Sequence, residues 1–170
     1  MEKVMRWGRR MQIVSIALAA LIPAAFLYVL WSHSLGDLVP LPTSVRLDPA
    51  SLSTGDRLLV GLLGLPRPIV YLICLWCLYR LFGLYRRGIV FEREATAWLI
   101  RVGYALIAFD FAAMIQAALA GPVLTLAGVT PPFLSIQLRI SYLIIGLFVL
   151  VIAHVMDIAR AINEEQQLTI

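Results

Sequence analysis

The sequence predicts an all-α, polytopic membrane protein with four transmembrane helices, the last of which extends into an amphipathic cytoplasmic tail. Of its 170 residues, 61% are apolar and 14% are charged, whereas soluble domains average about 45–50% apolar and about 25% charged residues. Four stretches reach the length of about 20 mostly apolar residues that a helix needs to cross the hydrocarbon core. This composition argues against a secreted enzyme, a disordered tail and a soluble DNA-binding module, so no direct contact with nucleic acid is expected.

The first two spans are expected at about residues 11–31 and about residues 58–82. The first carries no charged side chain, whereas the second is interrupted by the run Pro66-Arg67-Pro68. A helix interrupted inside a bilayer must be buried in protein or line a wet cavity, because its unpaired backbone groups find no water in lipid. Residues 32–57 between these spans are rich in turn-forming residues and are expected to form an outer loop.

The third and fourth spans are expected at about residues 95–120 and about residues 133–154. No span alternates apolar and polar residues, so a β-barrel is not expected. A tail at residues 155–170 follows, in which one apolar stripe separates from charged positions, as in an amphipathic helix. The four spans and the tail account for residues 1–170 as a single domain.

Lysine and arginine residues beside the spans predict the orientation, because they concentrate on the cytoplasmic side of a membrane protein. Ten of the 14 flank span ends that share one side, and four lie on the other. Both termini and the loop after the second span are therefore expected to face the cytoplasm. The ten are Lys3, Arg6, Arg9, Arg10, Arg80, Arg86, Arg87, Arg93, Arg101 and Arg160, and the four are Arg46, Arg57, Arg67 and Arg139.

Two segments on the expected cytoplasmic side carry a family resemblance. The loop contains Arg87, Gly88, Phe91 and Glu94, and the chain end contains Ile152, Ala153, Val155, Met156, Ala159, Glu164 and Glu165. They resemble the bacterial membrane family called domain of unknown function 2975, whose members look like four-span proteins with these motifs; Gln166 departs from the asparagine that the family often has. The resemblance implies no established activity and at most a cytoplasmic protein partner.

Asp110 is the clearest candidate for a functional residue. It falls near the middle of its span, where an ionisable side chain costs about 2.5–3.5 kcal/mol on insertion scales and indicates a functional site by default. Its helical face carries Gly103, Ala113 and Ala117, which would allow another helix to approach closely. The alternative is an aspartate that is protonated or paired and only locks helix packing.

Two arginines are candidate partners for Asp110 in the outer half of the membrane. Arg67 would share a face with Tyr71, and Arg139, about six residues into the fourth span, would share one with Tyr142. The three charges are expected to gather as a cluster that can receive an anionic headgroup or ligand, with Asp110 and Arg67 approaching one another. The alternative is that both arginines extend to the outer headgroups.

Cysteine and histidine residues give weaker signals. Cys74 and Cys77 have the C-x-x-C spacing of thiol redox motifs, although two cysteines inside one helix are usually small buried residues. His33 and His154 lie at opposite membrane faces and cannot share a metal ion. No catalytic, metal-binding or cofactor motif is recognisable, so no metal and no cofactor are expected.

The favoured interpretation is a non-enzymatic protein of the bacterial cytoplasmic membrane that senses or binds something and engages a cytoplasmic protein. Its partner-binding residues are expected to be Phe91, Glu94, Ile158, Ile162, Glu164 and Glu165. Membrane lipid is an expected partner, and assembly into a homo-oligomer is a further possibility. The main alternative is a transport or ion-conducting subunit that uses Asp110 and has to oligomerise, and the third is an intramembrane thiol redox protein.

Overall fold

The computed structural model describes residues 2–32, 38–39, 41, 52–90, 92–133, 135 and 139–167. This part of the chain holds five helices and no strand. The helices are α1 (Glu2–Trp31), α2 (Thr54–Gly64), α3 (Pro66–Arg86), α4 (Arg93–Leu126) and α5 (Ser141–Gln167). All except α2 are long and apolar enough to cross a membrane, which confirms the prediction of an all-α protein with four candidate spans.

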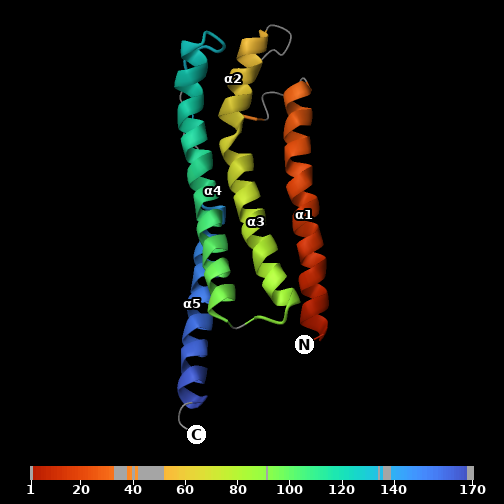
Figure 1. Cartoon of the computed structure of the whole chain (residues 1–170). Helices are drawn as coiled ribbons and strands as arrows, with labels where there is room; N and C mark the ends of the chain where they lie inside the picture. Colours follow the sequence, from red (N-terminus) through yellow and green to blue (C-terminus); the bar gives the residue numbers. More distant parts are fainter. Residues whose placement is uncertain are drawn as a thin grey trace.

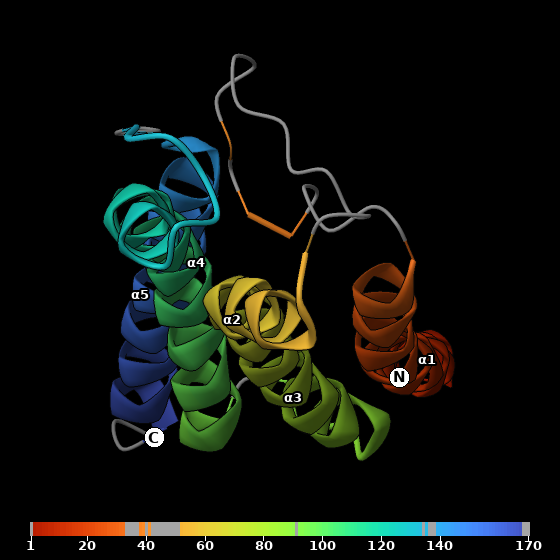
Figure 2. The same ribbon diagram turned by 90° about the horizontal axis from the view of Figure 1, so that it is seen from above.

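The four long helices form an open row rather than a closed bundle (Figures 1 and 2). In this row α1 packs on α3, α3 packs on α4, and α4 packs on α5. The central helix α4 is the most buried, with 39% of its most apolar stretch inside the molecule against 6% for α1. Both chain ends lie at the same end of the row, as four crossings require (Figure 1).

The expected second span, about residues 58–82, falls on two helices, α2 and α3, which follow one another with a break at Leu65; α3 alone is long enough to cross a membrane. The start of α2 is fixed by a capping box, in which the Ser53 side chain accepts from the Asp56 backbone and Asp56 accepts from the Ser53 backbone. The break follows from Pro66 and Pro68, which cannot donate backbone hydrogen bonds to α2 and are tolerated in the first turn of α3. The predicted interruption is therefore confirmed, although the helix begins four residues before Leu58, at Thr54.

The predicted start of the fourth span near Phe133 is wrong, because α5 begins at Ser141. The described residues between α4 and α5 are not helical, and they fold back along α4 after a turn at Gly128, whose φ is 71°. Gly121 allows this close return, since a Cβ atom there would overlap the backbone of Phe133. In contrast, α4 is longer than the predicted third span: its 34 residues extend about 50 Å at 1.5 Å per residue.

Two glycines bring α4 and α5 into backbone contact. A Cβ atom on Gly103 would lie 2.8 Å from the side chain of Leu150 and 3.2 Å from the Gly146 carbonyl oxygen. A Cβ atom on Gly146 would lie 2.7 Å from the side chain of Ile107 and 2.8 Å from the Gly103 carbonyl oxygen. Lipid tails are as apolar as the helices, so close packing of this kind replaces the hydrophobic effect as the main source of helix association.

Two buried clusters hold the row together. The first joins α3 and α4 near the end with the termini and contains Cys77, Leu81, Leu84, Ala95, Trp98 and Val102. The second lies at the opposite end, where Val39, between α1 and α2, packs with Val60, Ala120 and Leu124. The Gln116 side chain also donates a hydrogen bond to the Leu38 carbonyl oxygen at 2.8 Å. Leu38 and Val39 of the connection between α1 and α2 are thus built into the helical packing.

The length of the uncharged part of α1 allows the depth of the other helices in the membrane to be estimated. Its uncharged run of 21 residues, Met11–Trp31, matches a hydrocarbon core of about 30 Å at 1.5 Å per residue. Gly8 packs against the backbone of Arg86, and Phe26 lies beside Gly64, so α1 runs antiparallel to α3. This register places the middle of the core near Tyr71 of α3, and α5 therefore begins inside the core rather than at its surface.

Candidate functional site

Asp110 lies where α5 begins. It projects from the buried face of α4, is 5% exposed, and its Oδ2 accepts a hydrogen bond from the backbone N–H of Leu143 at 2.9 Å. Leu143 is the third residue of α5 and follows Asp110 by 33 positions. The carboxylate therefore caps the N-terminus of another helix inside the membrane core.

The position of this cap has a simple physical basis. The first backbone N–H groups of a helix have no partner within the helix, and an unpaired N–H group in hydrocarbon is costly. Helices usually solve this with a side chain directly before the first turn, but Ile140 precedes Ser141 here and offers none. The positive end of the helix dipole also favours a carboxylate at this point, so Asp110 and the start of α5 stabilise each other.

The expected pairing of Asp110 with Arg67 is wrong, since Asp110 forms no ion pair within the described part of the chain. Its Oδ2 binds the Leu143 N–H, and its Oδ1 is buried without a hydrogen-bond partner. Arg67 instead lines a groove of about 410 Å³ between α1 and the α2–α3 break, together with Phe26 and Tyr71. The helix N-terminus replaces the arginine as the source of positive charge for Asp110.

An aromatic trio surrounds the same junction. Tyr71 of α3, Phe109 of α4 and Tyr142 of α5 contact one another, with ring centroids 4.5 Å apart for Tyr71 and Phe109 and 4.6 Å apart for Phe109 and Tyr142. The two tyrosine hydroxyl groups are hydrogen-bonded at 3.0 Å. Three successive helices of the row thus meet beside Asp110. The predicted residues Tyr71 and Tyr142 are brought together, whereas Phe109 and Leu143 were missed.

Arg139 occupies a different place from the one expected. It precedes α5 as an exposed, non-helical residue instead of lying about six residues inside a fourth span. It is close enough to Arg67 for the two charges to interact. The two positive charges therefore lie near each other, but the expected cluster of three is not formed, because Asp110 is turned toward α5.

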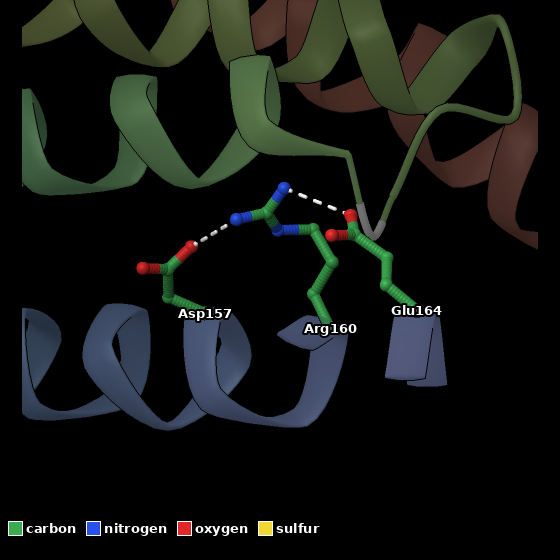
Figure 3. Close-up of polar contacts among 3 residues, drawn as sticks. All are labelled: Asp157, Arg160 and Glu164. Atoms are coloured by element: carbon green, nitrogen blue, oxygen red, sulfur yellow. Dashed lines mark hydrogen bonds and ion pairs between the residues drawn. The ribbon is translucent and has the colours of Figure 1, made fainter. Parts of the chain in front are cut away.

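Four of the six expected partner-binding residues have described side chains, and these four lie toward the end with the termini. Glu94 is exposed at the start of α4, and Ile158, Ile162 and Glu164 are exposed on α5. Arg160 donates to Asp157 at 2.9 Å and to Glu164 at 3.1 Å, so these three side chains form one charged row along the helix (Figure 3). Phe91 and the side chain of Glu165 lie outside the described residues.

Cys74 and Cys77 are free thiols on α3. Cys77 belongs to the buried cluster between α3 and α4, and Cys74 packs against it. Among the described residues, no group of three or more His, Cys, Asp or Glu side chains is placed to hold a metal ion.

The row of apolar helices and the buried cap at Asp110 define a polytopic, all-α membrane protein. The family model described as "Protein of unknown function (DUF2975)" matches residues 12–170. The chain therefore belongs to this family, as its loop and tail motifs indicated. Comparison with curated proteins gives no match, and comparison with solved structures gives none either.

Proposed function

We propose that the protein is a non-enzymatic sensing or binding protein of the bacterial cytoplasmic membrane, which relays a change at Asp110 to a protein partner in the cytoplasm. One observation carries the proposal: α5 begins on the Asp110 cap and continues as a single helix from Ser141 to Gln167. Its 27 residues extend about 40 Å at 1.5 Å per residue. A movement at the buried end is therefore transmitted to the exposed end.

Coupling of this kind requires an element with two states, and we assign both states to the junction. In one state Asp110 caps α5, and in the other the cap is released. Neutralising or displacing the carboxylate removes the favourable interaction with the helix N-terminus. The neighbouring groove with Arg67 is the entrance through which an anionic ligand would reach the junction, since it extends from Phe26 to Tyr71.

The far end of α5 has the features of an output surface. Ile158 and Ile162 are exposed and lie one turn apart, whereas Arg160 is held by Asp157 and Glu164 on another face (Figure 3). An amphipathic helix of this kind binds a partner by laying its apolar stripe in a groove. Sensing is favoured over ion conduction because Asp110 is buried and already bound to α5.

The first test concerns the tail. A chain that ends before Asp157 is expected to insert normally, because the Asp110 cap and the Gly103–Gly146 contact both remain. The experiment places a photoreactive amino acid at position 94 and records crosslinks to a protein partner in living cells. The full chain should form these crosslinks, and the shortened chain should not. The double variant Ile158→Ser and Ile162→Ser should lose the same crosslinks while the helix remains. If crosslinks persist in both variants, α5 is not the output and the proposal is wrong.

The second test concerns orientation. In a chain with Cys74→Ala and Cys77→Ala, a membrane-impermeant maleimide added to intact cells should label Thr54→Cys and should not label Arg93→Cys. Both positions are exposed, and they lie at opposite ends of the row. Permeabilised cells should give equal labelling and serve as the control. The reverse pattern would place the tail outside the cell and would remove the cytoplasmic partner from the proposal.

A further inference from the structure

A polar pocket of about 180 Å³ lies between α1, α3 and α4 at the end of the molecule with both termini. This volume equals that of about six water molecules at ~30 Å³ each, which suits a phosphate group but not a whole lipid. Its polar lining consists of Gln12, Tyr79, Arg80, Arg86, Arg87, Glu94 and Trp98. None of these residues contributes to the junction at Asp110.

The pocket carries an excess of positive charge. Three guanidinium groups, those of Arg80, Arg86 and Arg87, face a single carboxylate, that of Glu94. Within the described part of the chain none of the three forms an ion pair, not even with Glu94. Arginine presents several N–H donors in a planar fork that matches the oxygens of phosphate. The pocket therefore offers unused donors to an anion.

Two uncharged residues give the pocket a fixed wall. Trp98 is buried at 6% exposure, and its ring lies 5.1 Å from the guanidinium carbon of Arg80. This cation–π contact holds Arg80 in place. On the opposite side, the amide nitrogen of Gln12 lies 3.4 Å from where a Cβ atom of Gly83 would be, so the Gln12 amide packs beside α3 at Gly83.

The depth of the pocket identifies the kind of anion. Gln12 stands at the very start of the uncharged run of α1, and Arg86 and Arg87 lie where α3 ends. By the depth scale of α1, the pocket is thus level with the phosphates of the adjacent lipid leaflet. Basic pockets between transmembrane helices at this level bind the headgroups of anionic lipids.

We propose that this pocket binds a phosphate group, and that its natural ligand is an anionic phospholipid of the leaflet on the side of the termini. Arg80, Arg86 and Arg87 donate to the phosphate oxygens, Gln12 adds an uncharged donor, and Glu94 limits the affinity by repulsion. The acyl chains remain in the bilayer along the apolar surfaces of α1 and α3.

The test uses the full chain in detergent with three probes, namely short-chain phosphatidylglycerol, short-chain phosphatidylcholine and inorganic phosphate. Binding is measured by native mass spectrometry. Phosphatidylglycerol should bind at least tenfold more tightly than phosphatidylcholine. An arginine near an anionic lipid contributes about fivefold, so the triple variant Arg80→Gln, Arg86→Gln, Arg87→Gln should lose at least tenfold in affinity for phosphatidylglycerol.

A matched control removes the same charge outside the pocket. The variant Arg9→Gln, Arg10→Gln, Arg93→Gln changes three exposed arginines at the same end that do not line the pocket, and it should lose clearly less affinity than the pocket variant. The variant Glu94→Gln should bind phosphatidylglycerol about fivefold more tightly, a gain that unfolding cannot produce.

Three results would overturn the proposal. Equal losses in the two triple variants would show that surface charge alone attracts the lipid. No gain in Glu94→Gln would show that the anion does not enter the pocket. Inorganic phosphate that binds as tightly as phosphatidylglycerol and displaces it would leave a phosphate site but would overturn its assignment to a lipid.

Discussion

The Gly146→Leu variant is expected to lose the close contact between α4 and α5 and about 3 kcal/mol or more of the free energy of unfolding. Even one added carbon atom would lie 2.7 Å from the side chain of Ile107 and 2.8 Å from the Gly103 carbonyl oxygen. A backbone carbonyl cannot rotate away as a side chain does, so the helices must separate. Overpacking typically costs about 1–3 kcal/mol and occasionally more. Here the cost includes much of the α5 attachment, since α4 is its neighbour in the row.

A thermal unfolding experiment in detergent checks this result. The matched control is Ala108→Leu, which adds a larger side chain to the exposed face of α4 and should leave the melting temperature within a few degrees. Gly103→Leu should resemble Gly146→Leu, because the two glycines face each other. Equal stability of Gly146→Leu and Ala108→Leu would show that the two helices do not touch at this point.

The Asp110→Leu variant should lose about 2–4 kcal/mol of the free energy of unfolding. The change removes the acceptor of the Leu143 N–H group and leaves that group buried, which typically costs about 1–3 kcal/mol. It also removes a negative charge from the helix N-terminus, worth up to about 2 kcal/mol in buried positions. In contrast, Asp110→Asn keeps an oxygen that can accept the hydrogen bond and should lose less than about half as much.

The same experiment separates the cap from the ion pair that the sequence suggested. Arg67→Leu should change stability independently of Asp110→Leu, and the double variant should show the sum of the two losses, because independent sites add. Thermal melts of the four chains measure this directly. A double variant that is clearly more stable than the sum would restore the Asp110–Arg67 pair and refute the cap as the main role of Asp110.

Most of the fold could be predicted because transmembrane helices obey a strong rule. A bilayer demands about 20 apolar residues per crossing, and the runs around Ile16, Cys74, Ala113 and Phe148 fulfil it without ambiguity. The break in the second span was visible for the same reason, since Pro66 and Pro68 have no backbone N–H to donate. The open row was not predictable, because the outward faces of α1 and α5 are as apolar as the inward ones.

The start of α5 was misplaced although the sequence carries a signal for it. From Leu134 to Ser141, within the expected fourth span, apolar and polar residues alternate strictly, contrary to the expectation that no span alternates. This period of two is typical of an extended chain rather than a helix. The mean hydropathy of this segment averages its apolar and polar residues, so it did not distinguish the segment from the apolar helix that follows. Of this segment, the described residues Ser135, Arg139 and Ile140 are indeed non-helical, and Ser141 is the first residue of α5.

The error in α5 explains the error in the site. Asp110 was recognised because a carboxyl group in a span is rare, but its partner is a backbone N–H, which has no signature in the sequence. With α5 expected to start at Phe133, no helix N-terminus was available near Asp110, and Arg67 was the nearest source of positive charge. The pocket around Arg80 was missed because its arginines were assigned to the bias of positive charge toward the cytoplasmic side, and no further role was sought for them.

The link between Asp110 and Leu143 also constrains how the protein is made. Ribosomes deliver α4 before α5, so Asp110 enters the membrane while its partner, 33 residues later, is still unsynthesised. During that interval α4 carries an uncompensated carboxyl group, which disfavours its release into lipid by about 2.5–3.5 kcal/mol. We therefore expect α4 to leave the insertion machinery more readily once α5 has been made, because the first turn of α5 then compensates the carboxyl group.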